Sequence, residues 1–182
     1  MECIKLHGKT FHKVLAKDEI VKNIELLADK INADYADNPT PPMVIGMLNG
    51  AYIFCSELSQ RLTFNCDISF IKMQSYAGTE STGCVSKLIG LERDITGRDV
   101  IIVEDIVETG TTISAAWEML QKQNPSSIKI ATMMFKPESY HYKNIPIDYY
   151  AMEIPGNFIV GFGLDYDGLG RNLPDIYALM ED

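Results

Sequence analysis

The chain has 182 residues, of which 46% are hydrophobic, and a net charge of −9. This length and apolar content predict one globular domain with its own core and argue against disorder. The negative charge argues against non-specific binding to nucleic acids or anionic membranes. The N-terminus lacks the apolar stretch of a signal peptide, and no apolar run approaches the length of a membrane span. We therefore expect a cytoplasmic protein that binds neither nucleic acid nor membrane.

Residues 18–34 carry apolar side chains at helical spacing, which predicts a helix with Asp18 as its N-cap. Residues 43–47 predict a short buried strand, and a helix should follow to about residue 62. Between them, Leu48-Asn49-Gly50-Ala51 places a glycine at the strand end, where the backbone can approach an anion. An ordinary strand-to-helix turn is the alternative there.

Residues 67–73 and 85–91 each predict a strand, and residues 74–84 between them are small, polar and rich in hydroxyl groups. Such a segment is either a slack hairpin or a mobile lid. Its composition favours the hairpin, whereas Tyr76 favours a lid because a large ring in a polar loop usually covers something.

The β-branched run at residues 100–103 predicts a strand buried on both faces of a parallel sheet. Glu104 and Asp105 follow at once, at the carboxyl end where open α/β sheets bind ligands. Residues 108–112 (Glu-Thr-Gly-Thr-Thr) predict a turn that opens onto a helix, and such a helix start is a natural phosphate site. The acids and this turn suit a substrate with hydroxyls and phosphate. The alternative is a strand, turn and helix cap without chemistry.

Apolar residues 128–135 and 149–154 predict two further strands, and a third apolar segment ends at Asp165. Lys136 ends the first of these strands. It is either a solvated strand terminus or a group that faces the same rim as the acidic pair. Phe158 is either part of the core or a ring that stacks on a ligand.

Taken together, these segments resemble the hypoxanthine–guanine phosphoribosyltransferases of purine salvage over nearly the whole chain. The matching features are, in order, Leu48-Asn49-Gly50-Ala51, Ser75-Tyr76, Glu104-Asp105 with Thr109 to Thr112, Lys136-Pro137, Asn157 to Gly161, Leu164-Asp165-Tyr166 and Arg171. The resemblance implies an α/β, type I phosphoribosyltransferase fold, in which helices flank a central, mostly parallel sheet. It also implies a flexible lid at about residues 74–84 and a small hood from the N-terminus and C-terminal segment, within one domain spanning residues 1–182.

The resemblance implies transfer of the 5-phosphoribosyl group from 5-phosphoribosyl 1-pyrophosphate to hypoxanthine, guanine or both. It further implies Mg²⁺ as cofactor and a homodimer or homotetramer. A xanthine-preferring enzyme is one alternative. A nucleotide-binding regulator of the same fold is another, but such regulators tend to carry a basic face, and this chain is acidic.

By resemblance, the residues that contact ribose and its 5-phosphate are Glu104, Asp105, Thr109, Gly110, Thr111 and Thr112. The residues that contact pyrophosphate are Asn49, Gly50 and Arg171, and those that contact the purine are Lys136, Phe158, Ile159 and Leu164. Asp165, Glu104 and Asp105 would hold Mg²⁺, Ser75 and Tyr76 would close the lid, and Glu108 would manage the proton on purine N7.

The chain departs from the family pattern at two of these positions. Glu108 stands where the family usually has aspartate, which keeps the carboxylate but adds a methylene. Asn49 stands where many relatives have lysine, which removes a positive charge beside pyrophosphate.

Overall fold

The structure, a computed structural model, describes residues 2–75, 85–91 and 93–180. Each helix and strand predicted above is present, with bounds that differ by a few residues. In chain order, the elements are β1 (Cys3–Leu6), β2 (Lys9–Leu15), α1 (Lys17–Tyr35), β3 (Met43–Leu48), α2 (Tyr52–Ser59), β4 (Asp67–Ser75), β5 (Val85–Ile89), β6 (Asp99–Val107), α3 (Thr111–Gln121), β7 (Ser127–Phe135), the 3₁₀ turn η1 (Pro137–Ser139), β8 (Tyr149–Glu153), β9 (Ile159–Val160) and β10 (Ile176–Leu179).

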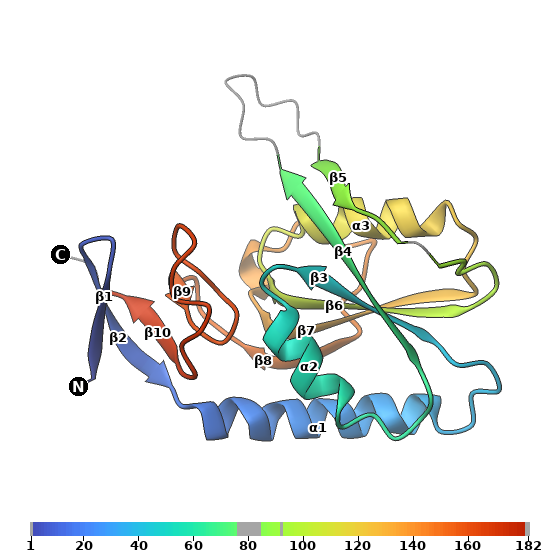
Figure 1. Cartoon of the computed structure of the whole chain (residues 1–182), viewed down its shortest axis with the longest axis horizontal. Coiled ribbons are helices and arrows are strands. Elements are labelled where there is room, and N and C mark those ends of the chain that lie inside the picture. The colour runs from blue at the N-terminus through green and yellow to red at the C-terminus, as the bar shows by residue number, and fades with distance from the viewer. Residues whose placement is uncertain (1, 76–84, 92, 181–182) are drawn as a thin grey trace.

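The larger sheet has six strands in the order β5-β4-β3-β6-β7-β8. Its pairs are parallel except for β4 and β5, so the sheet is mostly parallel, as predicted. Helices α1 and α2 cover one face and α3 covers the other (Figure 1). Because parallel strands all end at the same edge, the loops after β3, β6 and β7 meet there and can form one site.

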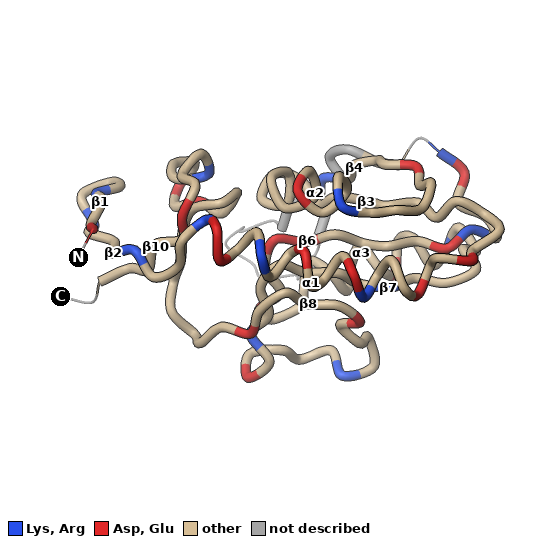
Figure 2. The backbone as a smooth tube through the Cα atoms, turned by 90° about the horizontal axis from the view of Figure 1, so that it is seen from below, with Lys and Arg blue, Asp and Glu red and all other residues tan. Residues whose placement is uncertain are grey.

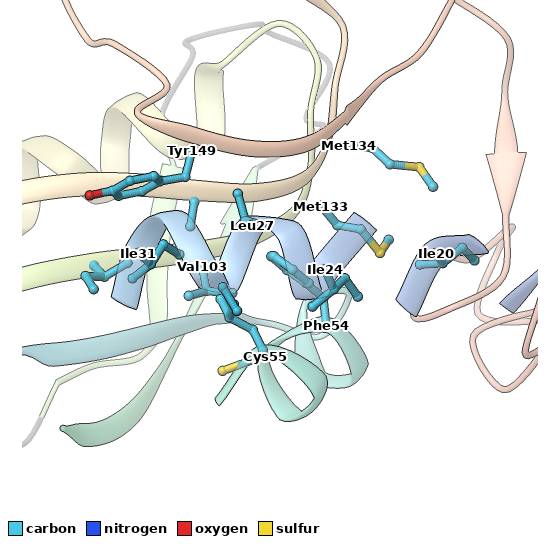
Figure 3. Close-up of a cluster of buried hydrophobic side chains, with 14 of the residues drawn as sticks. Ile20, Ile24, Leu27, Ile31, Phe54, Cys55, Val103, Met133, Met134 and Tyr149 are labelled. Atoms are coloured by element: carbon cyan, nitrogen blue, oxygen red, sulfur yellow. The ribbon is translucent and has the colours of Figure 1, made fainter. Parts of the chain in front are cut away.

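The central strand β6 is buried on both faces, as its β-branched run predicts. Ile101 and Val103 pack in the cluster under α1 and α2, whereas Val100 and Ile102 pack in the cluster under α3. In the first cluster, apolar side chains along one side of α1 meet residues of α2 and of the sheet (Figure 3). Each fully buried Ile or Val contributes roughly 1.5–3 kcal/mol, so this strand anchors the acidic residues that follow it.

The smaller sheet, which we call the hood, has four antiparallel strands in the order β1-β2-β10-β9. It joins the N-terminal strands to a C-terminal strand, as the predicted hood requires, and it lies at one end of the molecule (Figure 1). Phe11, Val160 and Tyr177 form its own buried cluster.

The predicted cap of α1 is wrong. The N-cap residue is Ala16, which provides no side-chain bond, and Asp18 lies inside the first turn. Asp175, in the turn before β10, accepts a hydrogen bond from the backbone amide of Lys17 at 2.8 Å instead. A carboxylate from the far end of the chain thus satisfies a free amide of the helix start, which local sequence cannot reveal.

Two other elements end elsewhere than predicted. Helix α2 ends at Ser59, three residues early, and β6 continues to Val107. Glu104 and Asp105 therefore lie within the strand rather than after it. Of the predicted lid, Tyr76 and the following residues to 84 lie outside the described part of the chain. Among the described helices, none is both long and apolar enough to cross a bilayer.

Candidate active site

Glu104 and Asp105 form an acidic pair near the carboxyl end of β6. Both residues are almost fully buried, with 9% of Glu104 and 8% of Asp105 exposed. Each carboxylate accepts a hydrogen bond from the next backbone amide, Glu104 Oε1 from Asp105 at 3.2 Å and Asp105 Oδ1 from Ile106 at 2.8 Å. Local backbone bonds therefore hold both carboxylates in place.

The protonation of the acidic pair is set mainly by its burial. Burial raises the pKa of Glu104 well above its ordinary value, and the neighbouring Asp105 carboxylate raises it further. Burial also raises the pKa of Asp105, against the opposing effects of its hydrogen bonds and of the Arg171 charge. The pair therefore holds a proton at a pH where exposed carboxylates have lost theirs.

The turn after β3 lies directly against this pair. A β-carbon on Gly50 would overlap Oδ2 of Asp105, so only glycine lets the turn approach so closely. The peptide bond before Asn49 is cis. The turn predicted to bind pyrophosphate thus touches the carboxylates predicted to bind ribose.

The turn after β6 opens directly into α3. Gly110, the N-cap residue of α3, has φ 85°, a left-handed conformation that glycine adopts freely. It has no side chain to cap the helix, and the Thr111 amide donates to the Thr109 hydroxyl at a long 3.5 Å. The hydroxyl oxygens of Thr109 and Thr111 lie 3.2 Å apart at this turn. A cavity of about 300 Å³ is lined by the turn, the acidic pair and Gly50. The amides at the helix start and the helix dipole make the side of the cavity at this turn suitable for an anion.

Residues 137–145, which we call the strap, follow β7 and pack against the turn after β6, residues 108–112, which we call the phosphate turn. A β-carbon on Gly110 would overlap the ring of Tyr140, and the amide of His141 donates to the Thr109 carbonyl at 3.2 Å. The Tyr140 hydroxyl donates to the Ile145 carbonyl at 2.6 Å, which fixes the ring. The strap thus supports the backbone of the turn.

Lys136 is buried, with 4% of the residue exposed, so it is not a solvated strand terminus. Its Nζ lies 3.2 Å from Oε1 of Glu108 and donates to the Asn157 carbonyl at 3.2 Å. The Glu108 side chain is half exposed. A cationic donor and an anionic acceptor therefore stand side by side at the rim of the site.

The hood contributes Asp165 and Arg171. Arg171 Nη2 lies 2.7 Å from Oδ1 of Asp165, and its Nη1 donates to the Gly163 carbonyl at 2.7 Å. A β-carbon on Gly163 would overlap the carbonyl oxygen of Gly50, so the hood touches the turn after β3. Phe158 is 47% exposed and is therefore not a core residue.

The phosphoribosyl transferase domain model matches residues 12–167. Two bacterial hypoxanthine-guanine phosphoribosyltransferases are similar, from Staphylococcus epidermidis (40% identity; 94% of this chain, 95% of the relative) and Streptococcus pyogenes (39%; 92% of each). A crystal structure of a Staphylococcus aureus hypoxanthine phosphoribosyltransferase superimposes with a TM-score of 0.85 at 37% identity, over 93% of this chain and 91% of that one. This chain belongs to the hypoxanthine–guanine phosphoribosyltransferase family.

Membership of the hypoxanthine–guanine phosphoribosyltransferase family agrees with the sequence resemblance and with the mostly parallel sheet and hood. The fold is the type I phosphoribosyltransferase fold, and the chain is a pentosyltransferase of purine salvage. The geometry shows how this member of the family arranges the side chains that its sequence singles out.

Most of the predicted site residues gather at one edge of the sheet. Those that line the 300 Å³ cavity are Gly50, Glu104, Asp105, Glu108, Thr109, Gly110, Thr111 and Thr112. Lys136 is not part of this lining, but its Nζ contacts Glu108, which is. Leu164 is only 6% exposed and packs in the core, and Ile159 lines a different cavity. Ser75 ends β4, and Tyr76 is not described.

Sequence reasoning missed two parts of the site in this phosphoribosyltransferase. Tyr140 supports the phosphate turn from a segment without apolar periodicity, so no local pattern identifies it. Gly163 meets the turn after β3 from the hood, more than a hundred residues away along the chain. Its place two residues after Gly161, in Gly161-Phe162-Gly163, was the one available signal, because clustered glycines often mark close backbone approach.

Proposed function

We propose that this chain transfers the 5-phosphoribosyl group of 5-phosphoribosyl 1-pyrophosphate to hypoxanthine and guanine, giving IMP or GMP and pyrophosphate. The observation that carries the proposal is the pair of Lys136 Nζ and Glu108 Oε1, 3.2 Å apart at the rim of the site. A 6-oxopurine with a proton on N7 presents an acceptor beside a donor on its edge. The protein pair offers the complementary donor and acceptor.

In the proposed reaction, the bond between the anomeric carbon and the pyrophosphate oxygen breaks as a bond from purine N9 forms. Positive charge develops on the ribose ring. Glu104 and Asp105 contact the ribose hydroxyls and supply fixed negative charge near that cation. Glu108 takes the proton that leaves N7, and Lys136 donates to the 6-oxo group. Phe158 stacks on the purine, for which its exposed ring is available.

The phosphates of the donor fit the two turns. Thr109, Gly110, Thr111 and Thr112 hold the 5-phosphate at the start of α3, where the N-cap residue is a glycine. Asn49, Gly50 and Arg171 contact the pyrophosphate. The Arg171 charge opposes the rise that burial causes in the pKa of Asp105, which supports a role for Arg171 on the acidic side of the site.

The residues present fit Mg²⁺ bound together with the substrate. No group of three or more His, Cys, Asp or Glu side chains in the described ranges could hold a metal ion. Mg²⁺ usually binds through one or two carboxylates plus substrate phosphates rather than in an all-protein cage. Glu104, Asp105 and Asp165 are the oxygen ligands that we assign. When bound, Mg²⁺ supplies positive charge that neutralises pyrophosphate and favours the ionised acidic pair.

We also propose a cytoplasmic homodimer or homotetramer in which each chain is one domain, with Ser75 and Tyr76 in a lid that excludes water. Exposed apolar side chains on β4, Ile68 at 47% and Phe70 at 38%, support an interface between copies. A nucleotide-binding regulator of the same fold is less well supported, because such regulators tend to carry a basic face, whereas basic and acidic residues are interspersed along this backbone (Figure 2). A preference for xanthine is decided by the assay below.

An assay with 5-phosphoribosyl 1-pyrophosphate, Mg²⁺ and each of hypoxanthine, guanine, xanthine and adenine tests the proposal. We expect nucleotide from hypoxanthine and guanine. Adenine should be poorer by roughly 10⁴-fold, because its amino group leaves the Lys136 donor unpaired. Excess chelator should abolish turnover, and added Mg²⁺ or Mn²⁺ should restore it. Equal efficiency with adenine would remove Lys136 from base recognition, and full activity in chelator would contradict the assigned cation.

A further inference from the structure

A second cavity, of about 600 Å³, lies between the hood and the core and shares no lining residue with the cavity at the acidic pair. Strands β2 and β10 of the hood form one wall. Helix α1 with strands β7 and β8 of the core forms the other. Its volume is within the range of small-molecule sites, about 300–1,000 Å³. A molecule bound here would contact both the hood and the core at once.

The lining of this cavity selects against anions. Its charged residues are Glu19 and Glu153, and it contains no lysine or arginine. Apolar residues dominate the lining, and they include Met134 and Met152, whose thioethers make favourable contacts with aromatic rings. A phosphorylated or carboxylated ligand would meet carboxylates without a compensating cation. An uncharged ligand with flat faces is favoured.

The cavity is not wholly apolar. His12, Asn23 and Asn157 are among its lining residues. Nδ1 of His12 is buried and has no hydrogen-bond partner within the described residues, so no bond to that nitrogen fixes the ring. The Asn23 amide is fixed, because it donates to the Glu19 carbonyl at 2.8 Å. Ring nitrogens or hydroxyls of a ligand can pair with polar groups of this lining, whereas a wholly apolar ligand cannot.

We propose that this cavity is a regulatory site for an uncharged heteroaromatic molecule of nucleobase or nucleoside size. Its size, its apolar faces, its polar groups and its lack of cations all match that class. The site is separate from the one that binds purine for transfer, although its effect on the purine, described next, rests on the proposed function.

One short segment separates the two sites. Asn157 lines the cavity, and its carbonyl accepts the hydrogen bond from Lys136 at 3.2 Å. Pro155 also lines the cavity, and Phe158, the residue after Asn157, carries the exposed ring beside Tyr166. A ligand that fills the cavity holds this segment, and with it the hood, in the arrangement that aims Lys136 at the rim. Ligand and purine therefore bind the same conformation and favour each other.

Adenosine and AMP are the matched probes, because they differ only by the anionic phosphate. We expect saturable adenosine binding by calorimetry, much weaker AMP binding, and a lower KM for hypoxanthine with adenosine present. Typical coupling between two sites is about 5- to 150-fold, and the linkage is reciprocal. Hypoxanthine should therefore tighten adenosine binding by the same factor. Binding is measured without turnover, so a failed transfer assay and a failed cavity test are distinguishable.

Two variants localise the binding. Ala151→Trp fills the cavity from β8, and Ala33→Trp places the same residue on the exposed side of α1 as a matched control. His12→Phe keeps a ring of similar size without its nitrogens. Adenosine binding should be lost in Ala151→Trp and in His12→Phe and kept in the control Ala33→Trp. Turnover in the absence of adenosine should be unchanged in all three variants.

Three outcomes would overturn the proposal. They are no saturable binding at millimolar adenosine, equal binding of AMP and adenosine, and binding that hypoxanthine displaces but Ala151→Trp retains. If Ala151→Trp does not fold, His12→Phe decides between the cavity and the active site.

Discussion

Glu108 differs from the usual family aspartate by one methylene, and in the structure this longer side chain forms an ion pair with Lys136. The longer side chain brings Oε1 to 3.2 Å from Lys136 Nζ, while half of it stays exposed to solvent. The carboxylate therefore has a partner in the free protein. A purine that enters the site exchanges this ion pair for two bonds to its own edge, so the pair is close to the geometry needed for binding.

Replacing Glu108 with glutamine should lower turnover by about 10²- to 10⁴-fold, because the amide cannot take up the N7 proton. Binding of the ribosyl donor should hardly change. Glu138→Gln, an exposed acid in the strap, is the matched control. Steady-state kinetics with both substrates measures these effects, and undiminished turnover would remove Glu108 from the chemistry.

Replacing Glu108 with aspartate restores the usual family residue but shortens its reach by about 1.5 Å. The contact with Lys136 is then lost, and misplacement of about 1 Å can cost roughly 10²-fold. We expect the variant to be slower than the natural protein under saturating substrates. A faster variant would show that the site kept the geometry of an aspartate.

Glu104 is expected to lower stability in exchange for function. Because its folded-state pKa is raised, the folded protein binds that proton more tightly than the unfolded chain does. The contribution of Glu104 to stability is therefore most favourable below its unfolded-state pKa, and it is lost as pH rises through the folded pKa. Glu104→Gln, studied in chelator, should raise the melting temperature at pH 8 by about 2–4 °C for each kcal/mol gained. It should also abolish turnover.

The exposed Glu118 on α3 provides the control for this comparison, since Glu118→Gln should leave the melting temperature unchanged. The gain of Glu104→Gln over the natural protein should shrink at acidic pH. A loss of stability at pH 8 would show that the acidic pair is stabilised by its hydrogen bonds more than it is destabilised by burial.

At the scale of the elements, patterns of burial were predictable and long-range partners were not. The run at residues 100–103 identifies a doubly buried strand because both faces need apolar side chains. It cannot show that the strand continues through Glu104 and Asp105, since their pairing depends on the neighbouring strands. Asp18 fits a cap by residue type, but Asp175 lies against the helix start. Motif residues gather because parallel strands end together, whereas Tyr140 depends on how the strap folds back.

Tyr140 of the strap allows a test of whether a residue that does not contact the substrate supports the phosphate turn. Tyr140→Leu removes the ring that packs on Gly110, so the phosphate turn should loosen. We expect the KM for the ribosyl donor to rise by roughly 10-fold, about 1.4 kcal/mol, with a much smaller change in kcat. Tyr140→Phe loses only the hydroxyl bond to Ile145 and keeps the ring, so its KM should stay near the natural value. An equal rise in both variants would assign the effect to the hydroxyl.

For the whole molecule, Asp175 provides one of the contacts that join the hood to the core. Its carboxylate accepts from the Lys17 amide at 2.8 Å and lies 3.1 Å from Lys13 Nζ. The first of these contacts is the main reason that the pKa of Asp175 is lowered. A lowered pKa contributes stability above the unfolded-state value, and this contribution is lost as pH falls through the folded value.

Asp175→Ala should therefore destabilise the protein at neutral pH by about 0.5–2 kcal/mol, the usual cost of losing a helix cap. The difference from the natural protein should shrink as pH falls, which denaturant unfolding at several pH values can measure. Asp29→Ala, on the exposed side of α1, is the control. A difference that grows in acid would contradict the assigned role.

The hood also sets the time at which a newly made chain can become active. Its strand β2 pairs with β10, and Lys13 is 162 residues from its partner Asp175. A ribosome takes roughly 10–30 s to add that many residues. During that interval β2 has no β10 to pair with, and Gly163 and Arg171 are among the last parts of the site to emerge. A stalled or truncated nascent chain could fold much of the core sheet, yet it could not assemble the side of the site that the hood supplies.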